Sequence, residues 1–107
     1  MKLNDTWVSD MRTRLAPEIV ADPMMAELAE EYLVELADIV DTIKTCSEQG
    51  NIDTIRDSSH KLKGSAGTFG LCDIGLKAGE LECACKRGES IETIRILVAQ
   101  LRLVAKL

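Results

Sequence analysis

The sequence predicts an all-α protein, an up-down-up-down four-helix bundle preceded by a short N-terminal helix. Apolar residues recur at steps of three and four over most of the chain, the spacing that places them on one face of a helix. Only two prolines and three aromatic residues are present, and the chain lacks the long β-branched runs of a sandwich or barrel. Its 107 residues suffice for one hydrophobic core, so we expect one domain over residues 1–107.

Turn and capping residues divide the chain into five expected helices. These cover about residues 5–15, 23–48, 52–69, 73–87 and 91–106, with the bundle itself at about 23–106. Pro17 interrupts the chain after the first helix, and Asp22 is the expected N-cap of the second, with Pro23 at its first position. Gly50 ends the second helix and Asn51 caps the third. The connections of two to five residues predict that neighbouring helices run antiparallel.

The long second helix shows the core pattern most clearly. Its expected inward positions are Met25, Leu28, Tyr32, Leu36, Ile39, Ile43 and Cys46. Seven positions at alternating three- and four-residue steps make one continuous apolar stripe.

Composition excludes several classes of function. The net charge of −5 disfavours nucleic acid as a partner, because binding to phosphates needs a basic surface. No apolar run approaches the roughly 20 residues of a membrane span. The first residues lack the apolar stretch of a signal peptide, so we expect a cytoplasmic protein. The four cysteines show no Cys-x-x-Cys spacing, which predicts free thiols and no metal site.

His60 is the single histidine of the chain, and its surroundings are unusual. On a helical wheel of about 100° per residue it falls outside the apolar stripe of the third helix. Arg56, Lys63, Gly64 and Gly67 fall near it, at offsets of −4, +3, +4 and +7. Glycine within a helix costs about 1 kcal/mol relative to alanine. The pattern predicts an exposed ring beside two cations, with Gly64 and Gly67 giving clearance for a docking partner.

This arrangement favours phosphoryl transfer through the ring. A neutral imidazole is a competent nucleophile near pH 7, because its ordinary pKa is about 6.5. Lys63 and Arg56 can balance the charge of a phosphoryl group, and Asp57, three residues before His60, can orient the ring by a hydrogen bond. The chain has no Gly-rich phosphate loop and no acidic cluster for magnesium. We therefore expect a partner protein to supply the metal and any catalytic groups.

At these residues the sequence resembles the histidine-containing phosphotransfer (HPt) domain family of two-component phosphorelays. The family pattern of His-x-Leu-Lys-Gly, two small residues, an apolar residue and Gly is matched by His60, Leu62, Lys63, Gly64, Ser65, Ala66, Phe69 and Gly70. Leu81-Glu82 matches a Leu-Glu element on the next helix, and Gly88-Glu89 and Gly50-Asn51 resemble family turns. Gly67 departs from the pattern, because the family commonly has alanine or another small residue there.

The resemblance implies a four-helix bundle in which His60 accepts a phosphoryl group from a receiver-domain aspartate or a kinase and passes it to another receiver. Lys63 would stabilise that group and Gly64 would give clearance, while the receiver would hold the magnesium ion. It further implies a phosphocarrier and not an enzyme, with no cofactor of its own. The expected partners are response-regulator receiver domains and a sensor or hybrid histidine kinase, and we expect a monomer. Family docking surfaces generally use the histidine helix and the helix before it.

Three other kinds of protein are also built as helical bundles, and the sequence argues against two of them. The phosphoacceptor bundle of a sensor kinase usually has Glu or Asp directly after the histidine, where this chain has Lys61, and a proline a few residues later. A ferritin-like metalloprotein needs paired Glu-x-x-His motifs, which one histidine cannot provide. A bundle that only binds a receiver would share the same surface, so the sequence leaves this reading open. It also leaves open the direction of phosphoryl transfer, and whether the chain is free-standing or part of a hybrid kinase.

Overall fold

The structure is a computed structural model that describes residues 5–107, and every regular element in this range is a helix. The helices are α1 (Asp5–Arg14), α2 (Pro17–Ala21), α3 (Pro23–Gln49), α4 (Ile52–Thr68), α5 (Cys72–Lys86) and α6 (Ile91–Ala105). The predicted all-α class is therefore confirmed. Residues 1–4, which the expected domain over 1–107 includes, lie outside the described residues.

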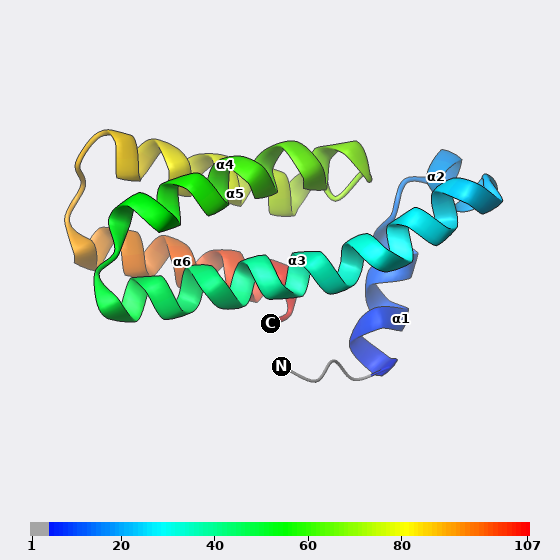
Figure 1. The fold of residues 1–107 in the computed structure, drawn as a ribbon, viewed down its shortest axis with the longest axis horizontal. Coiled ribbons are helices and arrows are strands. Elements are labelled where there is room, and N and C mark those ends of the chain that lie inside the picture. The colour runs from blue at the N-terminus through cyan, green and yellow to red at the C-terminus, as the bar shows by residue number, and fades with distance from the viewer. Residues whose placement is uncertain (1–4) are drawn as a thin grey trace.

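The four long helices lie side by side, and consecutive ones run in opposite directions (Figure 1). Contacts join α3 to α4, α4 to α5, α5 to α6 and α6 back to α3. The N-terminal part of α3 extends beyond the ends of the other three, where α2 packs against it and α1 crosses its end (Figure 1). Because α4 packs against α3 on one side and α5 on the other, its remaining face is left to solvent.

The turn chemistry read from the sequence places the helix ends correctly. The Asp22 side chain accepts hydrogen bonds from the first backbone amides of α3, and Asn51 caps α4 through the amide of Thr54. Gly50 ends α3 in the left-handed conformation, with φ of 73°. The short helix α2 was not expected. Pro17, which was expected only to interrupt the chain, instead lies in its first turn, where its fixed φ favours a helix.

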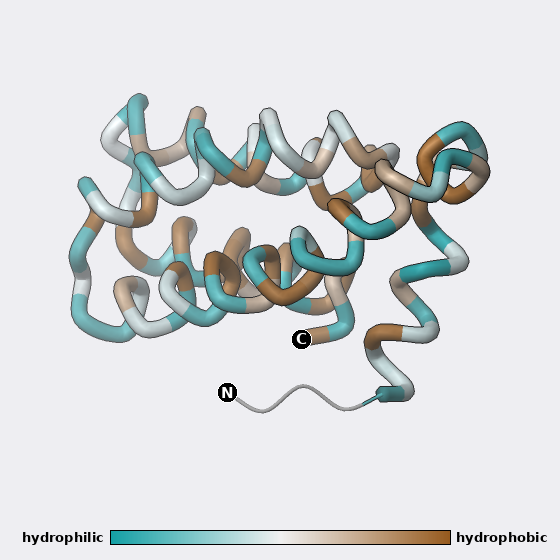
Figure 2. Tube along the Cα trace, turned by 45° about the vertical axis from the view of Figure 1, so that its right-hand side comes forward, coloured by the Kyte–Doolittle hydropathy of each residue, from teal (hydrophilic) through white to brown (hydrophobic). Residues whose placement is uncertain are grey.

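The core lies between the four long helices, where the apolar segments face inward (Figure 2). Its largest fully buried side chains include Leu33, Leu36, Ile43, Ile55, Leu62, Leu81 and Leu101. The expected inward position of Leu28 is wrong, because this side chain is 46% exposed. Leu28 lies in the N-terminal part of α3, where α2 and α1 pack against this helix.

The N-terminal helices are held against one end of the long helices. Trp7 Nε1 donates a hydrogen bond of 2.8 Å to the carbonyl of Ala105 at the end of α6. The amide of Ala16 donates one of 3.1 Å to the carbonyl of Phe69 in the α4–α5 turn. Gly70 of that turn has φ of 83°, and a Cβ added there would lie 2.5 Å from the Ala16 Cβ. A side chain at residue 70 is therefore excluded twice, by the backbone conformation and by lack of space.

Two further expectations concern membranes and thiols. Within residues 5–107, no helix is both long and apolar enough to cross a bilayer. The four cysteines are free thiols, as predicted, with Cys46 and Cys85 buried and Cys72 and Cys83 exposed.

Candidate functional site

His60 lies midway along α4, on the face that no neighbouring helix covers. The stripe of α4 that faces the core consists of Ile55, Ser59, Leu62 and Ala66, all fully buried. The side chain of His60 is 73% exposed. The expected placement of the ring outside the packed stripe is therefore what the structure shows.

The ring is held by a carboxylate that the sequence analysis did not assign. Nδ1 of His60 lies 2.7 Å from Oε2 of Glu82, on α5, and only 5% of the Glu82 side chain is exposed. Nδ1 is therefore the protonated donor when Glu82 is ionised, and Nε2 has no hydrogen-bond partner among residues 5–107. Because the Glu82 side chain is buried, its carboxylate has few alternative positions, and it therefore fixes the orientation of the exposed ring.

Asp57 is the expected orienting carboxylate, and for the ring hydrogen bond that expectation is wrong. Its side chain is 75% exposed, and Oδ1 lies 3.4 Å from Nε of its neighbour Arg56. Spacing along one helix reveals only neighbours on that helix, whereas α5 brings in a carboxylate 22 residues away. The sequence contains one sign of this role, because Glu82 is an acidic residue that directly follows the core residue Leu81.

Two lysines complete the environment of Glu82. Nζ of Lys86, one turn later on α5, lies 3.2 Å from Oε2, and Nζ of Lys63 lies 3.9 Å from Oε1. Burial by itself would raise the pKa of Glu82, but hydrogen bonds and charge from Lys86 and His60 outweigh it and lower that pKa. Glu82 is therefore ionised at neutral pH and accepts the ring proton's hydrogen bond as an anion.

Arg56 and Lys63, the cations expected near the ring, are both in its neighbourhood. Arg56 pairs with Asp53 at 3.6 Å and, together with Asp57, His60, Glu82 and Lys86, lines a hollow of about 400 Å³. The stem of Lys63 lies across Gly79 of α5, whose missing side chain leaves it room: a Cβ there would be 3.4 Å from the Lys63 Cδ. Lys86 is the second cation that lines this hollow, beside Arg56, and the sequence analysis did not assign it.

The glycines of α4 open the surface beside the ring. A Cβ added at Gly64 or Gly67 would meet no atom within 4 Å. Packing therefore does not explain why either residue lacks a side chain. The clearance for a partner that the sequence analysis assigned to them stays a prediction, and the space it requires is present.

The remaining motif residues anchor α4 to α3. The hydroxyls of Ser65 and Tyr32 are 2.7 Å apart, and the Tyr32 ring stacks on Phe69 with centroids 4.5 Å apart. Lys61 pairs with Glu35 on the same side of α4, at 3.2 Å. These contacts hold the histidine helix from the side opposite to Glu82.

A family model of the Hpt domain matches residues 27–106. The chain belongs to the Hpt domain family. The matched range contains the ring, Glu82 and all three cations, and it excludes α1, α2 and the first turn of α3. The chain is also 26% identical over 86 residues to the phosphorelay protein LuxU of Vibrio cholerae serotype O1, which covers 80% of this chain and 76% of LuxU. No solved structure matches this chain.

Proposed function

We propose that this Hpt domain is a histidine phosphocarrier in a two-component phosphorelay, which accepts a phosphoryl group on His60 and exchanges it with receiver-domain aspartates. The observation that carries the proposal is the exposed ring whose Nδ1 is bonded to Glu82, since this leaves Nε2 as the free nucleophile. The similarity to the phosphorelay protein LuxU and the family match point to the same role.

In the transfer, the lone pair of Nε2 attacks the phosphorus of a receiver aspartyl phosphate. The bond between phosphorus and the aspartate oxygen breaks, and its electron pair leaves with the carboxylate as the N–P bond forms. The ring keeps its proton on Nδ1 and becomes positively charged, which the ionised Glu82 offsets at 2.7 Å. The reverse step returns the bonding pair to the ring, so the carrier is restored unchanged.

The cations around the ring suit a transferred group that carries negative charge. Lys63 and Arg56 are the proposed phosphoryl-stabilising residues, and Lys86 joins them because its ammonium group lies at the same carboxylate as the ring. Phosphoryl transfer depends mainly on in-line positioning and on charge stabilisation. We assign the magnesium ion and the remaining catalytic groups to the receiver, so that the domain acts as a carrier and not as an enzyme.

The arrangement of α3 to α6 supports the up-down-up-down four-helix bundle that the family resemblance implies. A monomer suits the proposed role, because a receiver must reach the ring, Gly64 and Gly67 from solvent. The upstream partner is a receiver domain or a sensor or hybrid histidine kinase. The proposed site of action is the cytoplasm, where such kinases and receivers meet.

The test is transfer from a radiolabelled, phosphorylated receiver with magnesium, comparing the native protein with His60→Gln. We expect label on the native protein alone, stable to alkali and lost in acid, as a phosphoramidate is. Lys61→Gln is the matched control, since it changes the adjacent exposed residue of α4 and should be labelled normally. Label retained by His60→Gln would reject the site. Binding of receivers without label on the native protein would instead favour a domain that only docks.

A further inference from the structure

The antiparallel helices α4 and α5 meet in successive residue pairs on the side that carries the histidine. His60 faces Glu82, with 2.7 Å between Nδ1 and Oε2. Three residues further along α4 and three residues back along α5, Lys63 faces Gly79, where an added Cβ would lie 3.4 Å from the Lys63 Cδ. Residues three apart on a helix share a face, so the second pair lies beside the first. The side chain of Lys63 is therefore placed against a residue that has none.

The room at Gly79 is taken by the stem of Lys63. The three atoms nearest to an added Cβ at Gly79 are Cδ, Cε and Cγ of Lys63, at 3.4, 3.7 and 3.8 Å. Gly75, one turn earlier on α5, differs from it. A Cβ added at Gly75 would lie 3.4 Å from the carbonyl oxygen of Lys63 and 3.8 Å from the amide nitrogen of Gly67. Gly75 therefore faces the backbone of α4, whereas Gly79 faces one side chain.

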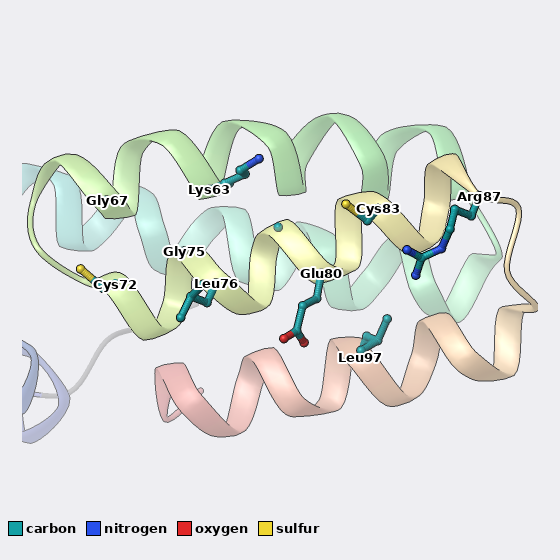
Figure 3. A pocket seen from close by; sticks show the side chains of 10 residues that line it. Lys63, Gly67, Cys72, Gly75, Leu76, Glu80, Cys83, Arg87 and Leu97 are labelled. Carbon is teal, nitrogen blue, oxygen red and sulfur yellow. The ribbon is translucent and has the colours of Figure 1, made fainter.

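The path of the stem over Gly79 brings the ammonium group of Lys63 to the site of the ring. Nζ of Lys63 lies 3.9 Å from Oε1 of Glu82, whose other carboxylate oxygen holds His60. In Figure 3, the Lys63 side chain extends from α4 toward the end of α5 that carries Cys83, the residue after Glu82. The Lys63 side chain is still 56% exposed, so a transferred group can reach the ammonium group. Contact along the stem restricts a side chain that otherwise samples many rotamers.

We propose that Gly79 is a positioning residue for phosphoryl transfer: its small size lets the stem of Lys63 cross α5 and hold the ammonium group beside His60. This inference rests on the proposed phosphocarrier function and adds to it the residue that places Lys63. The distances set the size limit. A Cβ at 3.4 Å from Cδ is an ordinary van der Waals contact, so alanine fits at this position. The branch carbons of valine would overlap the stem and turn Lys63 away from Glu82.

NMR tests the placement of Lys63 without any phosphoryl donor. The native protein should show nuclear Overhauser effects between the α protons of Gly79 and the δ and ε protons of Lys63. The signal of the Lys63 ammonium nitrogen should shift on Glu82→Gln when residue 79 is glycine, and should lose that response in Gly79→Val. The first measurement needs only the native protein. Absence of the Overhauser effects at Gly79 would overturn the proposal.

The effect on the reaction is measured as single-turnover transfer over a range of concentrations of a phosphorylated receiver. Gly79→Val should lower the maximal rate by about tenfold and leave the half-saturating receiver concentration within about twofold of native, because the ammonium group acts on the transferred group and not on docking. Gly79→Ala should stay within about twofold of native in both quantities. Cys72→Val is the matched control, since Cys72 and Gly79 line the same hollow of about 840 Å³ along α5 (Figure 3). It places the same side chain about two turns from Gly79 and should transfer at the native rate.

A double-mutant cycle separates the placement of Lys63 from a general disturbance of the bundle. In a Lys63→Ala background, where no stem crosses α5, Gly79→Val should change the maximal rate by less than about twofold. Equal losses in both backgrounds would mean that residue 79 acts on the fold, and would overturn the proposal. Native-like transfer by Gly79→Val would also overturn it and leave the phosphocarrier function standing. Absence of label on the native protein from every receiver would reject that function, and the role of Gly79 with it.

Discussion

Two regions of the α4–α5 pair both contain glycines, and the glycines serve opposite purposes. Beside His60, Gly64 and Gly67 face open space, and no atom lies within 4 Å of where a side chain would begin. At the end of α4, Gly70 sits against Ala16, which would be 2.5 Å from an added Cβ. The first region is left open to solvent and the second is closed by the N-terminal helices. The role of a glycine in this fold can therefore be assigned only when the atoms around it in space are known.

The two regions also differ in what holds them together. The closed end is fixed by backbone hydrogen bonds and by Trp7, whose indole reaches the last turn of α6. The site is fixed by a charged network in which Glu82 contacts His60, Lys86 and Lys63. Changes at the closed end should therefore affect stability, and changes in the network should affect transfer. The following predictions test that division, from the largest expected effect to the smallest.

The largest effect is expected at the closed end. Gly70→Ala must force a side chain into a positive φ and into contact with Ala16, which should lower the free energy of unfolding by about 2–3 kcal/mol. Urea unfolding monitored by circular dichroism measures this loss. Phosphoryl transfer by the folded fraction should stay within about twofold of native, because the charged network is untouched. A large loss of transfer at full folding would show that the two regions are coupled.

The next largest effect concerns the ring. Glu82→Gln keeps the shape of the side chain but removes the anion that offsets the charged ring, and should slow transfer by about ten- to a hundredfold. Asp57→Asn is the matched control, since the same neutralisation is made at a carboxylate that contacts Arg56 and not the ring. The rate of single-turnover transfer from a phosphorylated receiver is measured for both variants. Equal losses in both variants would remove Glu82 from its assigned role.

A smaller effect is expected for the lysine that the sequence analysis missed. Lys86→Ala should slow transfer by about fivefold, because one of the cations near the transferred group is lost. Lys61→Ala, which removes a cation of the same helix as the ring but paired with Glu35 on the α3 side, should change the rate by less than about twofold. The same single-turnover assay compares them. A reversed order would place the phosphoryl group on the α3 side of the ring.

The smallest effect tests the open glycines directly. Gly64→Ala should raise the free energy of unfolding by about 0.5–1 kcal/mol, because alanine is the better helix former and space is available. The same substitution should weaken receiver binding, since the added methyl group stands where the partner approaches. Unfolding and binding titrations on one sample measure both. A variant that is less stable than native would mean that Gly64 is needed by the fold and not by the partner.

Most of the fold could be predicted because local signals determine it. Asp22 with Pro23, Gly50 and Asn51 each act on a helix end through neighbours in sequence, and the apolar spacing defines the core stripes. The exceptions depend on distant parts of the chain. Pro17 begins a short helix that packs against α3, and Leu28 is exposed although it continues the apolar spacing of that helix.

In the candidate site, too, only the residues that are close together in the sequence could be predicted. His60, Lys63, Arg56, Gly64 and Gly67 belong to one helix, so a helical wheel places them together. Glu82 and Lys86 come from α5, and only the packing of α5 against α4 brings them to the ring. Glycines that make this packing close, such as Gly79 under the Lys63 stem, carry no distinguishing signal in the sequence.

The central claim is that Glu82 holds Nδ1 of His60 and leaves Nε2 to carry the phosphoryl group. Long-range ¹H–¹⁵N NMR of the two ring nitrogens measures this directly, before and after phosphorylation. The account predicts that Nδ1 of the resting ring carries a proton shared with Glu82, and that phosphorus is bonded to Nε2 in the phosphorylated protein. A resting ring whose Nδ1 carries no proton, or phosphorus on Nδ1 after transfer, would contradict it.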